Sequence, residues 1–100
     1  MILDMREVSS ITDYFVIATG SSDPHLRAIG NEIISKLKHD KGVTPRAVDG
    51  AIRASWRVLD YFDVIVHLMQ QEARDRYDLE GLWGDAPRLR PRASAKKKAV

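Results

Sequence analysis

The chain has 100 residues and no cysteine, so its length suits one compact domain, and disulfides, thiolate metal sites and cysteine nucleophiles are excluded. Hydrophobic residues make up 44% and charged residues 30%, which is typical of a soluble globular protein, and no apolar run approaches the roughly 20 residues of a membrane helix. The first residues lack a basic segment followed by an apolar one, so we expect no secretory signal and a cytoplasmic protein.

The first half of the chain predicts two strands and one long helix. Residues 1–5 read as a short strand, and the continuous apolar run Tyr14–Ala18 predicts a strand buried on both faces. Turn-forming residues follow, with Asp23 as a candidate N-cap and Pro24 at the first helical position. A helix then extends to about His39, because apolar residues recur on one of its faces, and Gly42 ends it.

The second half predicts shorter elements. An extended piece spans residues 45–50, and two strands over residues 55–60 and 64–69 are joined so tightly that they must be antiparallel. The Tyr14 strand, the helix and a later strand resemble a β–α–β unit, which favours a parallel pairing. A short helix over residues 71–77 and a turn over residues 79–83 complete the domain. We therefore predict an α/β fold: a mixed sheet of about five strands with one long and one or two short helices.

The net charge of +2 is the sum of two unlike parts. Residues 1–86 hold 10 lysines and arginines and all 14 acidic residues, which gives 10 − 14 = −4, whereas residues 87–100 hold six cations and no acid. The composition also changes at Pro87, after which too little apolar surface remains to offset the entropy of ordering. We predict one domain over 1–86 and a basic, disordered tail over 87–100. The tail suits either attraction to nucleic acid or a merely solubilising role.

Two enzymatic interpretations have little support. The loop Thr19–Ser22 lies between a strand and a helix N-terminus, where backbone N–H groups can bind phosphate, but it matches neither the P-loop nor the dinucleotide-binding pattern. A nucleotidyltransferase would need closely spaced carboxylates for two Mg²⁺ ions. Asp60 and Asp63 are the nearest pair, and no third carboxylate is evident. A tight turn that ends in a helix cap explains the loop better.

The three histidines do not form a metal site. They are His25, His39 and His67, and none of them has a partner at ligand spacing, whereas a structural zinc site usually needs four ligands. His67 lies within an apolar strand and is better explained as a hydrogen-bonded residue of the core or of a sheet face. A triad of Ser21, Asp23 and His25 is unlike known catalytic triads, because the three are too close in sequence to converge. We expect no cofactor and no metal.

Aromatic and acidic residues gather in two segments of the second half. Trp56, Tyr61 and Phe62 lie on or beside the predicted hairpin, and a second group of apolar and acidic residues fills the C-terminal turn. Aromatic side chains are enriched at interfaces, and carboxylates suit a basic partner. The alternative is that the same side chains pack on the sheet and complete the core.

Three blocks of the chain resemble the ribosomal silencing factor family, also called RsfS or Iojap-like. Asp13–Ser22 followed by His25 is similar to its D-Y-F-V-I-A-T-G-S-x-x-x-H signature. Trp56–His67 is similar to its W-x-L-L-D-Y-x-D-V-V-V-H block, and Arg74–Asp85 to its R-x-x-Y-D-L-E-x-L-W-G-D block. The blocks occur in the family's order and spacing and cover residues 4–85.

The resemblance implies a translation regulator that is not an enzyme. Family members bind the large ribosomal subunit through its fourteenth ribosomal protein, block joining of the small subunit, and in some cases serve in ribosome biogenesis. The fold implied is nucleotidyltransferase-like without the catalytic carboxylates, and homodimers occur off the ribosome. The basic tail lies outside the shared pattern and would add at most non-specific contact with ribosomal RNA.

Carried over to this sequence, the resemblance places the partner-binding residues in the last two blocks. Those residues are Trp56, Asp60, Tyr61, Asp63, Tyr77, Asp78, Leu79, Glu80, Leu82 and Trp83. The aromatic and leucine side chains would supply buried anchors, and the carboxylates would pair with arginine or lysine. Two departures stand out: family members usually have a helix before the first strand, and Phe62 stands at a turn position that is often glycine.

Overall fold

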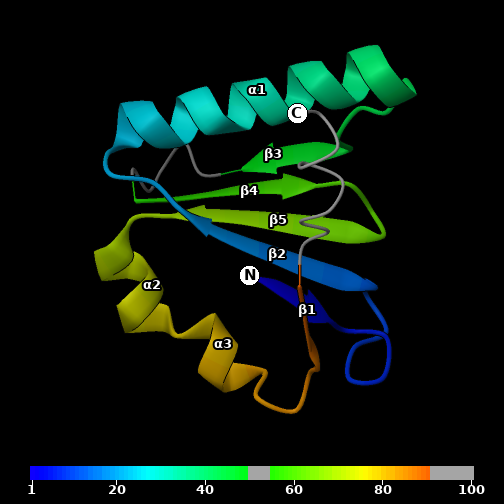
Figure 1. The fold of residues 1–100 in the computed structure, drawn as a ribbon, viewed down its shortest axis with the longest axis vertical. Coiled ribbons are helices and arrows are strands. Elements are labelled where there is room, and N and C mark those ends of the chain that lie inside the picture. The colour runs from blue at the N-terminus through cyan, green and yellow to red at the C-terminus, as the bar shows by residue number, and fades with distance from the viewer. Residues whose placement is uncertain (50–54, 91–100) are drawn as a thin grey trace.

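A six-stranded mixed sheet forms the centre of the computed structural model, which describes residues 1–49 and 55–90 (Figure 1). The order of its strands is β3-β4-β5-β2-β1-β6. The strands are β1 (Ile2–Asp4), β2 (Tyr14–Thr19), β3 (Ala47–Asp49), β4 (Trp56–Asp60), β5 (Val64–Met69) and β6 (Arg88–Leu89). The helices are α1 (Asp23–Lys41), α2 (Gln71–Tyr77) and α3 (Leu79–Leu82).

The strand pairings confirm the predicted α/β fold. β2 and β5 are parallel, with Tyr14 opposite Val64, and α1 lies in the crossover between them. β4 and β5 are antiparallel and joined by a tight hairpin, with Asp60 opposite Ile65. β1 and β3 pair antiparallel with β2 and β4. The sheet is therefore mixed, as the tight hairpin and the β–α–β pattern together require.

A sixth strand, β6, adds to the about five strands predicted and lies after residue 86, within the segment predicted as a tail. Leu89 pairs with Ile2 in an antiparallel bridge, and the Asp4 N–H donates to the Pro87 carbonyl at 2.8 Å. Both contacts use backbone groups, which any composition can supply, so the cationic sequence did not reveal them. The rest of the predicted tail, residues 91–100, lies outside the described residues.

Helix α1 begins one residue earlier and ends two residues later than the sequence indicated. Ser22, rather than Asp23, is the N-cap, and its hydroxyl accepts the His25 N–H at 3.2 Å. Gly42 ends the helix in the left-handed region, with φ 66°. Although α1 has 19 residues, no helix in the described part of the chain is long and apolar enough to span a membrane.

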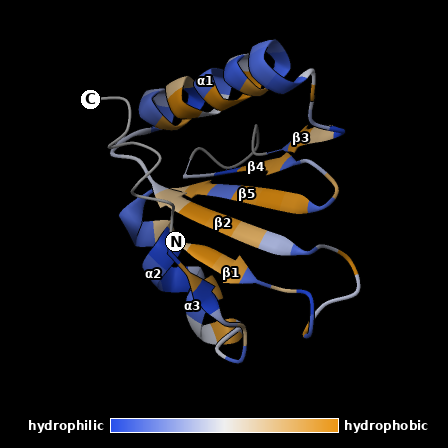
Figure 2. Ribbon diagram, turned by 45° about the vertical axis from the view of Figure 1, so that its right-hand side comes forward, coloured by the Kyte–Doolittle hydropathy of each residue, from blue (hydrophilic) through white to orange (hydrophobic). Residues whose placement is uncertain are grey.

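The sheet packs a separate hydrophobic cluster on each face, because successive side chains of a strand point to opposite sides. One cluster lies under α1 and consists of Leu26, Leu59, Val66 and Leu68. The other lies under α2, α3 and the chain that follows them and consists of Leu3, Met5, Ile17, Met69, Ala73, Leu79 and Ala86. Figure 2 shows apolar strands between an amphipathic α1 and a largely polar α2.

Candidate functional site

Five rings form a continuous row, which we call the aromatic row, on the face of the sheet that carries α2 and α3. The Trp83 ring lies edge-on to Phe15 with 6.2 Å between centroids, and Phe15 lies edge-on to His67 at 4.6 Å. His67 lies 5.9 Å from Trp56, which lies 4.7 Å from Tyr77. Rings at these separations stabilise one another beyond their burial alone. The row therefore links three central strands to the ends of α2 and α3.

The register of the strands explains why these rings meet. Val58 of β4 and Ile17 of β2 lie directly opposite His67 of β5, so all three side chains point to the same face. Trp56 and Phe15 are each two residues away from those positions and therefore on the same face, diagonal to His67. Of the five rings, Phe15 and His67 were not among the predicted partner-binding residues. Phe15 lies two residues before Ile17, and His67 lies two residues after Ile65. This spacing of two along each strand is the signal that places all four side chains on one face of the sheet.

A hydrogen bond inside the row sets the tautomer of His67, and burial keeps its ring neutral. The Trp56 Nε1–H donates to His67 Nδ1 at 3.2 Å, so Nδ1 must carry a lone pair and the proton of the neutral ring is on Nε2. Burial lowers the pKa of His67 to about 4. The Nε2 atom is buried and has no hydrogen-bond partner among the described residues. His67 is therefore a neutral side chain that orients Trp56, in agreement with the prediction that it is a hydrogen-bonded sheet residue.

The junction between α2 and α3 is a tight turn centred on Asp78. This residue has φ 45°, its N–H donates to the Arg74 carbonyl at the end of α2, and its side chain accepts the Gly81 N–H at 3.1 Å at the start of α3. A Cβ on Gly81 would collide with the Asp78 carboxylate, so a larger residue there would force the capping side chain to shift. The turn places Leu79 in the core, where it is 8% exposed, and leaves Leu82 70% exposed.

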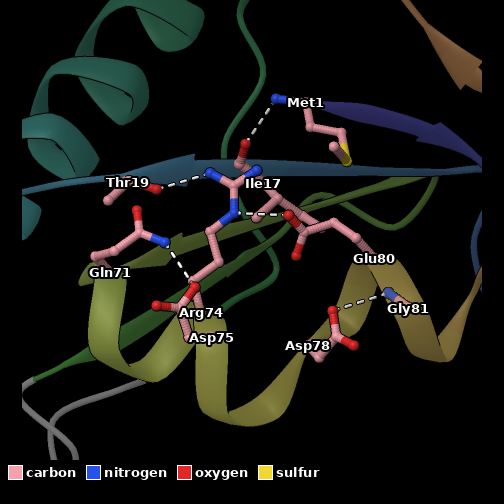
Figure 3. A network of polar contacts seen from close by, with 9 residues as sticks. All are labelled: Met1, Ile17, Thr19, Gln71, Arg74, Asp75, Asp78, Glu80 and Gly81. Carbon is pink, nitrogen blue, oxygen red and sulfur yellow. Dashed lines mark hydrogen bonds and ion pairs between the residues drawn. The ribbon is translucent and has the colours of Figure 1, made fainter.

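Arg74 fixes this pair of helices to the sheet (Figure 3). Its Nε donates to the Glu80 carboxylate at 2.8 Å, and an Nη donates to the Thr19 hydroxyl at the end of β2 at 2.7 Å. The side chains of Arg74 and Glu80 are only 20% and 18% exposed, so the pair is partly shielded from solvent. Glu80, a predicted partner-binding residue, is thus already bonded within the fold. Nothing in the sequence spacing indicated the role of Arg74.

The three predicted residues of the β4–β5 hairpin lie apart from α2 and α3, at the opposite end of the sheet in Figure 1. Asp60 accepts the Phe62 N–H at 2.8 Å and the Arg46 Nε–H at 3.0 Å, and these bonds, the first foremost, lower the pKa of its carboxyl. Tyr61 packs against the cluster under α1, and burial raises its pKa. Asp63 is exposed at the turn. The ten predicted residues therefore form two groups rather than one surface.

The predicted turn Thr19–Ser22 borders a depression of about 460 Å³ at the carboxyl end of β2 and β5. The His25 ring accepts the Ser21 N–H at 2.9 Å, so this turn closes on the first turn of α1. Glu72 is the one carboxylate among the lining residues. In the described part of the chain, no three histidine or acidic side chains converge as metal ligands do. The geometry gives no argument for two-metal phosphoryl transfer at this turn.

The fold, together with the predicted residues at the β4–β5 hairpin and those around α2 and α3, defines a class of protein. It is a small mixed α/β domain with an acidic and aromatic surface. The model of the family "Ribosomal silencing factor during starvation" matches residues 1–100, so the chain belongs to the ribosomal silencing factor family, which is not a known family of enzymes. A ribosomal silencing factor from Bacillus subtilis is 40% identical over 85 residues, which cover 85% of this chain and 71% of that protein.

Two further relatives support this assignment. A crystal structure of a Chromobacterium violaceum protein is 34% identical, with a TM-score of 0.78, over 91% of this chain and 72% of that one. A mouse protein named "Mitochondrial assembly of ribosomal large subunit protein 1" is 38% identical over 74 residues, which cover 72% of this chain and 32% of that protein. The predicted family and fold are thus confirmed, together with a role related to the ribosome.

Proposed function

We propose that the protein binds the large ribosomal subunit through its fourteenth ribosomal protein and sterically blocks joining of the small subunit, which lowers translation. Family membership supports the ribosomal role. The same bound state would serve large-subunit biogenesis. A cytoplasmic location accords with this proposal, and homodimers would form only off the ribosome.

The observation that carries the proposal is the surface of α2 and α3, which we call the helical surface. Leu82 is 70% exposed and Tyr77 is 37% exposed, although both are large apolar side chains held on rigid supports. Asp75, Asp78 and Asp85 of the same segment are exposed, and residues 72–85 hold five carboxylates against two arginines, which gives 2 − 5 = −3. An apolar centre with an acidic rim fits a partner surface that is apolar and rimmed by lysine and arginine, as ribosomal proteins commonly are.

Burial distinguishes the residues of this segment that pack on the sheet from those that a partner could cover. Leu79 and Trp83 face the sheet, so truncating either of them removes core packing. Leu82 faces solvent, and its transfer into an interface would stabilise the complex by up to about 2 kcal/mol, which corresponds to roughly 30-fold in affinity. Leu82→Ala is therefore the substitution that tests binding without disturbing the fold.

The test is sedimentation of ribosomes at a Mg²⁺ concentration that normally gives whole ribosomes. Added protein should leave free subunits and should co-sediment with the large one, whereas Leu82→Ala should need a higher concentration for the same effect, by a factor of up to about 30. Leu89→Ala is the matched control, because Leu89 is also exposed, at 40%, but lies on β6. Whole-ribosome peaks that stay unchanged at saturating protein would refute the proposal.

A further inference from the structure

The turn of the β4–β5 hairpin contains an aromatic residue in a backbone conformation that favours glycine. Phe62 has φ 78°, and its side chain is 62% exposed. A non-glycine residue in this region costs conformational energy, and a ring in water gains none of it back by burial. Such outliers gather at functional positions, because folding alone gives no reason to keep them. Phe62 is therefore a candidate contact residue.

The surrounding side chains hold the Phe62 ring in one place. The Arg46 guanidinium lies 4.5 Å from the centre of the ring, within the range of a cation–π contact. Asp60 accepts both the Phe62 N–H and the Arg46 Nε–H, so one carboxylate fixes the turn and the cation together. An exposed ring that is held rigid loses little side-chain entropy when a partner covers it.

A second exposed apolar residue belongs to the same end of the molecule. Ile11, in the loop between β1 and β2, is 71% exposed. The loop is tied to the hairpin turn, because the Asp63 carbonyl accepts the Thr12 hydroxyl at 2.8 Å and the Asp13 N–H at 2.9 Å. Phe62 and Ile11 directly precede Asp63 and Thr12 in the chain. Both side chains thus belong to segments that hydrogen bonds hold together, and we call this part of the molecule the hairpin-end surface.

The charge of this surface selects the kind of partner. Asp13 and Asp63 are exposed carboxylates, whereas Arg46 is already paired with Asp60 at 3.0 Å. A second cation, Arg6, lies over the Tyr14 ring beside Asp13 and is paired with Asp4 at 2.7 Å. These six charged groups sum to two cations and four anions, or −2. A negative rim repels the phosphates of RNA and attracts lysine and arginine. Apolar anchors within such a rim fit an apolar patch on a basic protein.

We infer that the hairpin-end surface, with Phe62 and Ile11 as its anchors, is a second contact for a basic protein of the large ribosomal subunit. This inference rests on the proposed function and adds to the helical surface a separate point of attachment. Two rigidly connected contacts bind more tightly than either does alone, because the second forms without a further loss of translational freedom.

The test measures affinity for purified large subunits with Phe62→Gly, Ile11→Ser and the control Leu89→Ser, which removes an exposed aliphatic side chain at the far edge of the sheet. We expect Phe62→Gly and Ile11→Ser each to weaken binding about 10-fold and Leu89→Ser to bind like the parent. Thermal unfolding should show that all three are folded, since glycine suits φ 78°. Ile11→Ser keeps the test valid should Phe62→Gly fail to fold.

Three results would overturn the inference. Parent-like affinity of both variants, while Leu82→Ala still weakens binding, would leave the proposed function standing and exclude this surface. A parent that does not bind large subunits would refute the proposed function and this inference with it. An equal loss of binding to protein-free ribosomal RNA would show that the surface contacts nucleic acid instead.

Discussion

His67 makes the stability of the domain depend on pH, and the size of the effect follows from its environment. Burial lowers its pKa from the ordinary 6.5 to about 4 in the folded protein. Between these two values the unfolded chain binds a proton that the folded protein does not, so the free energy of unfolding falls as the pH falls. The replacement His67→Gln removes the titrating group and therefore this part of the pH dependence.

The magnitude can be worked out from the two pKa values. The difference of 6.5 − 4 = 2.5 units corresponds to about 3 kcal/mol over the whole window, which is lost progressively between pH 6.5 and pH 4. Between pH 7 and pH 5 the expected loss is about 2 kcal/mol, because the unfolded chain is mostly protonated at pH 5 and the folded protein is mostly not.

Urea denaturation at pH 7 and pH 5, followed by the fluorescence of Trp56 and Trp83, measures this difference. The parent should lose about 2 kcal/mol more than His67→Gln over the interval, since the remaining titrations are common to both proteins. Equal losses in parent and variant would refute the assignment of a buried, neutral His67. A loss in the parent that increases toward higher pH would contradict the direction of the pKa shift.

Three further substitutions and two controls test the contributions of packing, backbone conformation and hydrogen bonds to stability, each by urea denaturation at pH 7. Leu79→Ala should lower the free energy of unfolding by about 2–4 kcal/mol because it empties part of the core, whereas Leu82→Ala should change it by less than about 0.5 kcal/mol. Gly42→Ala should cost about 1 kcal/mol, because φ 66° at the end of α1 strains any residue with a Cβ. Arg74→Ala should cost about 1–2 kcal/mol, since it removes two hydrogen bonds of a partly buried side chain. The matched control Arg76→Ala, whose side chain is 64% exposed, should stay within about 0.5 kcal/mol, and equal effects of both arginines would contradict the role given to Arg74.

The strongly patterned elements were predictable from the sequence. The continuous apolar run after Asp13 forms β2, the apolar stripe after Pro24 forms α1, and the tight link before Val64 is an antiparallel hairpin. Each of these patterns reports local geometry or the face that a residue buries, and both are properties of a short segment. The family blocks added the order of the elements and the expectation of a ribosomal role.

Contacts between distant segments were not predictable in the same way. The pairing of β6 with β1 depends on backbone groups whose positions are set by the preceding turn, so the residues at Arg88 carry no signal for it. The aromatic row needs the register of three strands before Phe15 and His67 can be placed beside Trp56. The bond from Arg74 to Thr19 joins residues 55 apart, which no local pattern reports.

The pairing of β1 with β6 also determines how the domain responds to mechanical force. Ile2 and Leu89 are direct partners at one edge of the sheet, so tension applied through both ends of the described chain loads this pair first. The strands separate by peeling, in which each hydrogen bond carries the force in turn, rather than by shear, in which several share it. Only two residue pairs hold β6. A machine that unfolds proteins by pulling on the chain after β6 would therefore meet little resistance at this edge of the sheet.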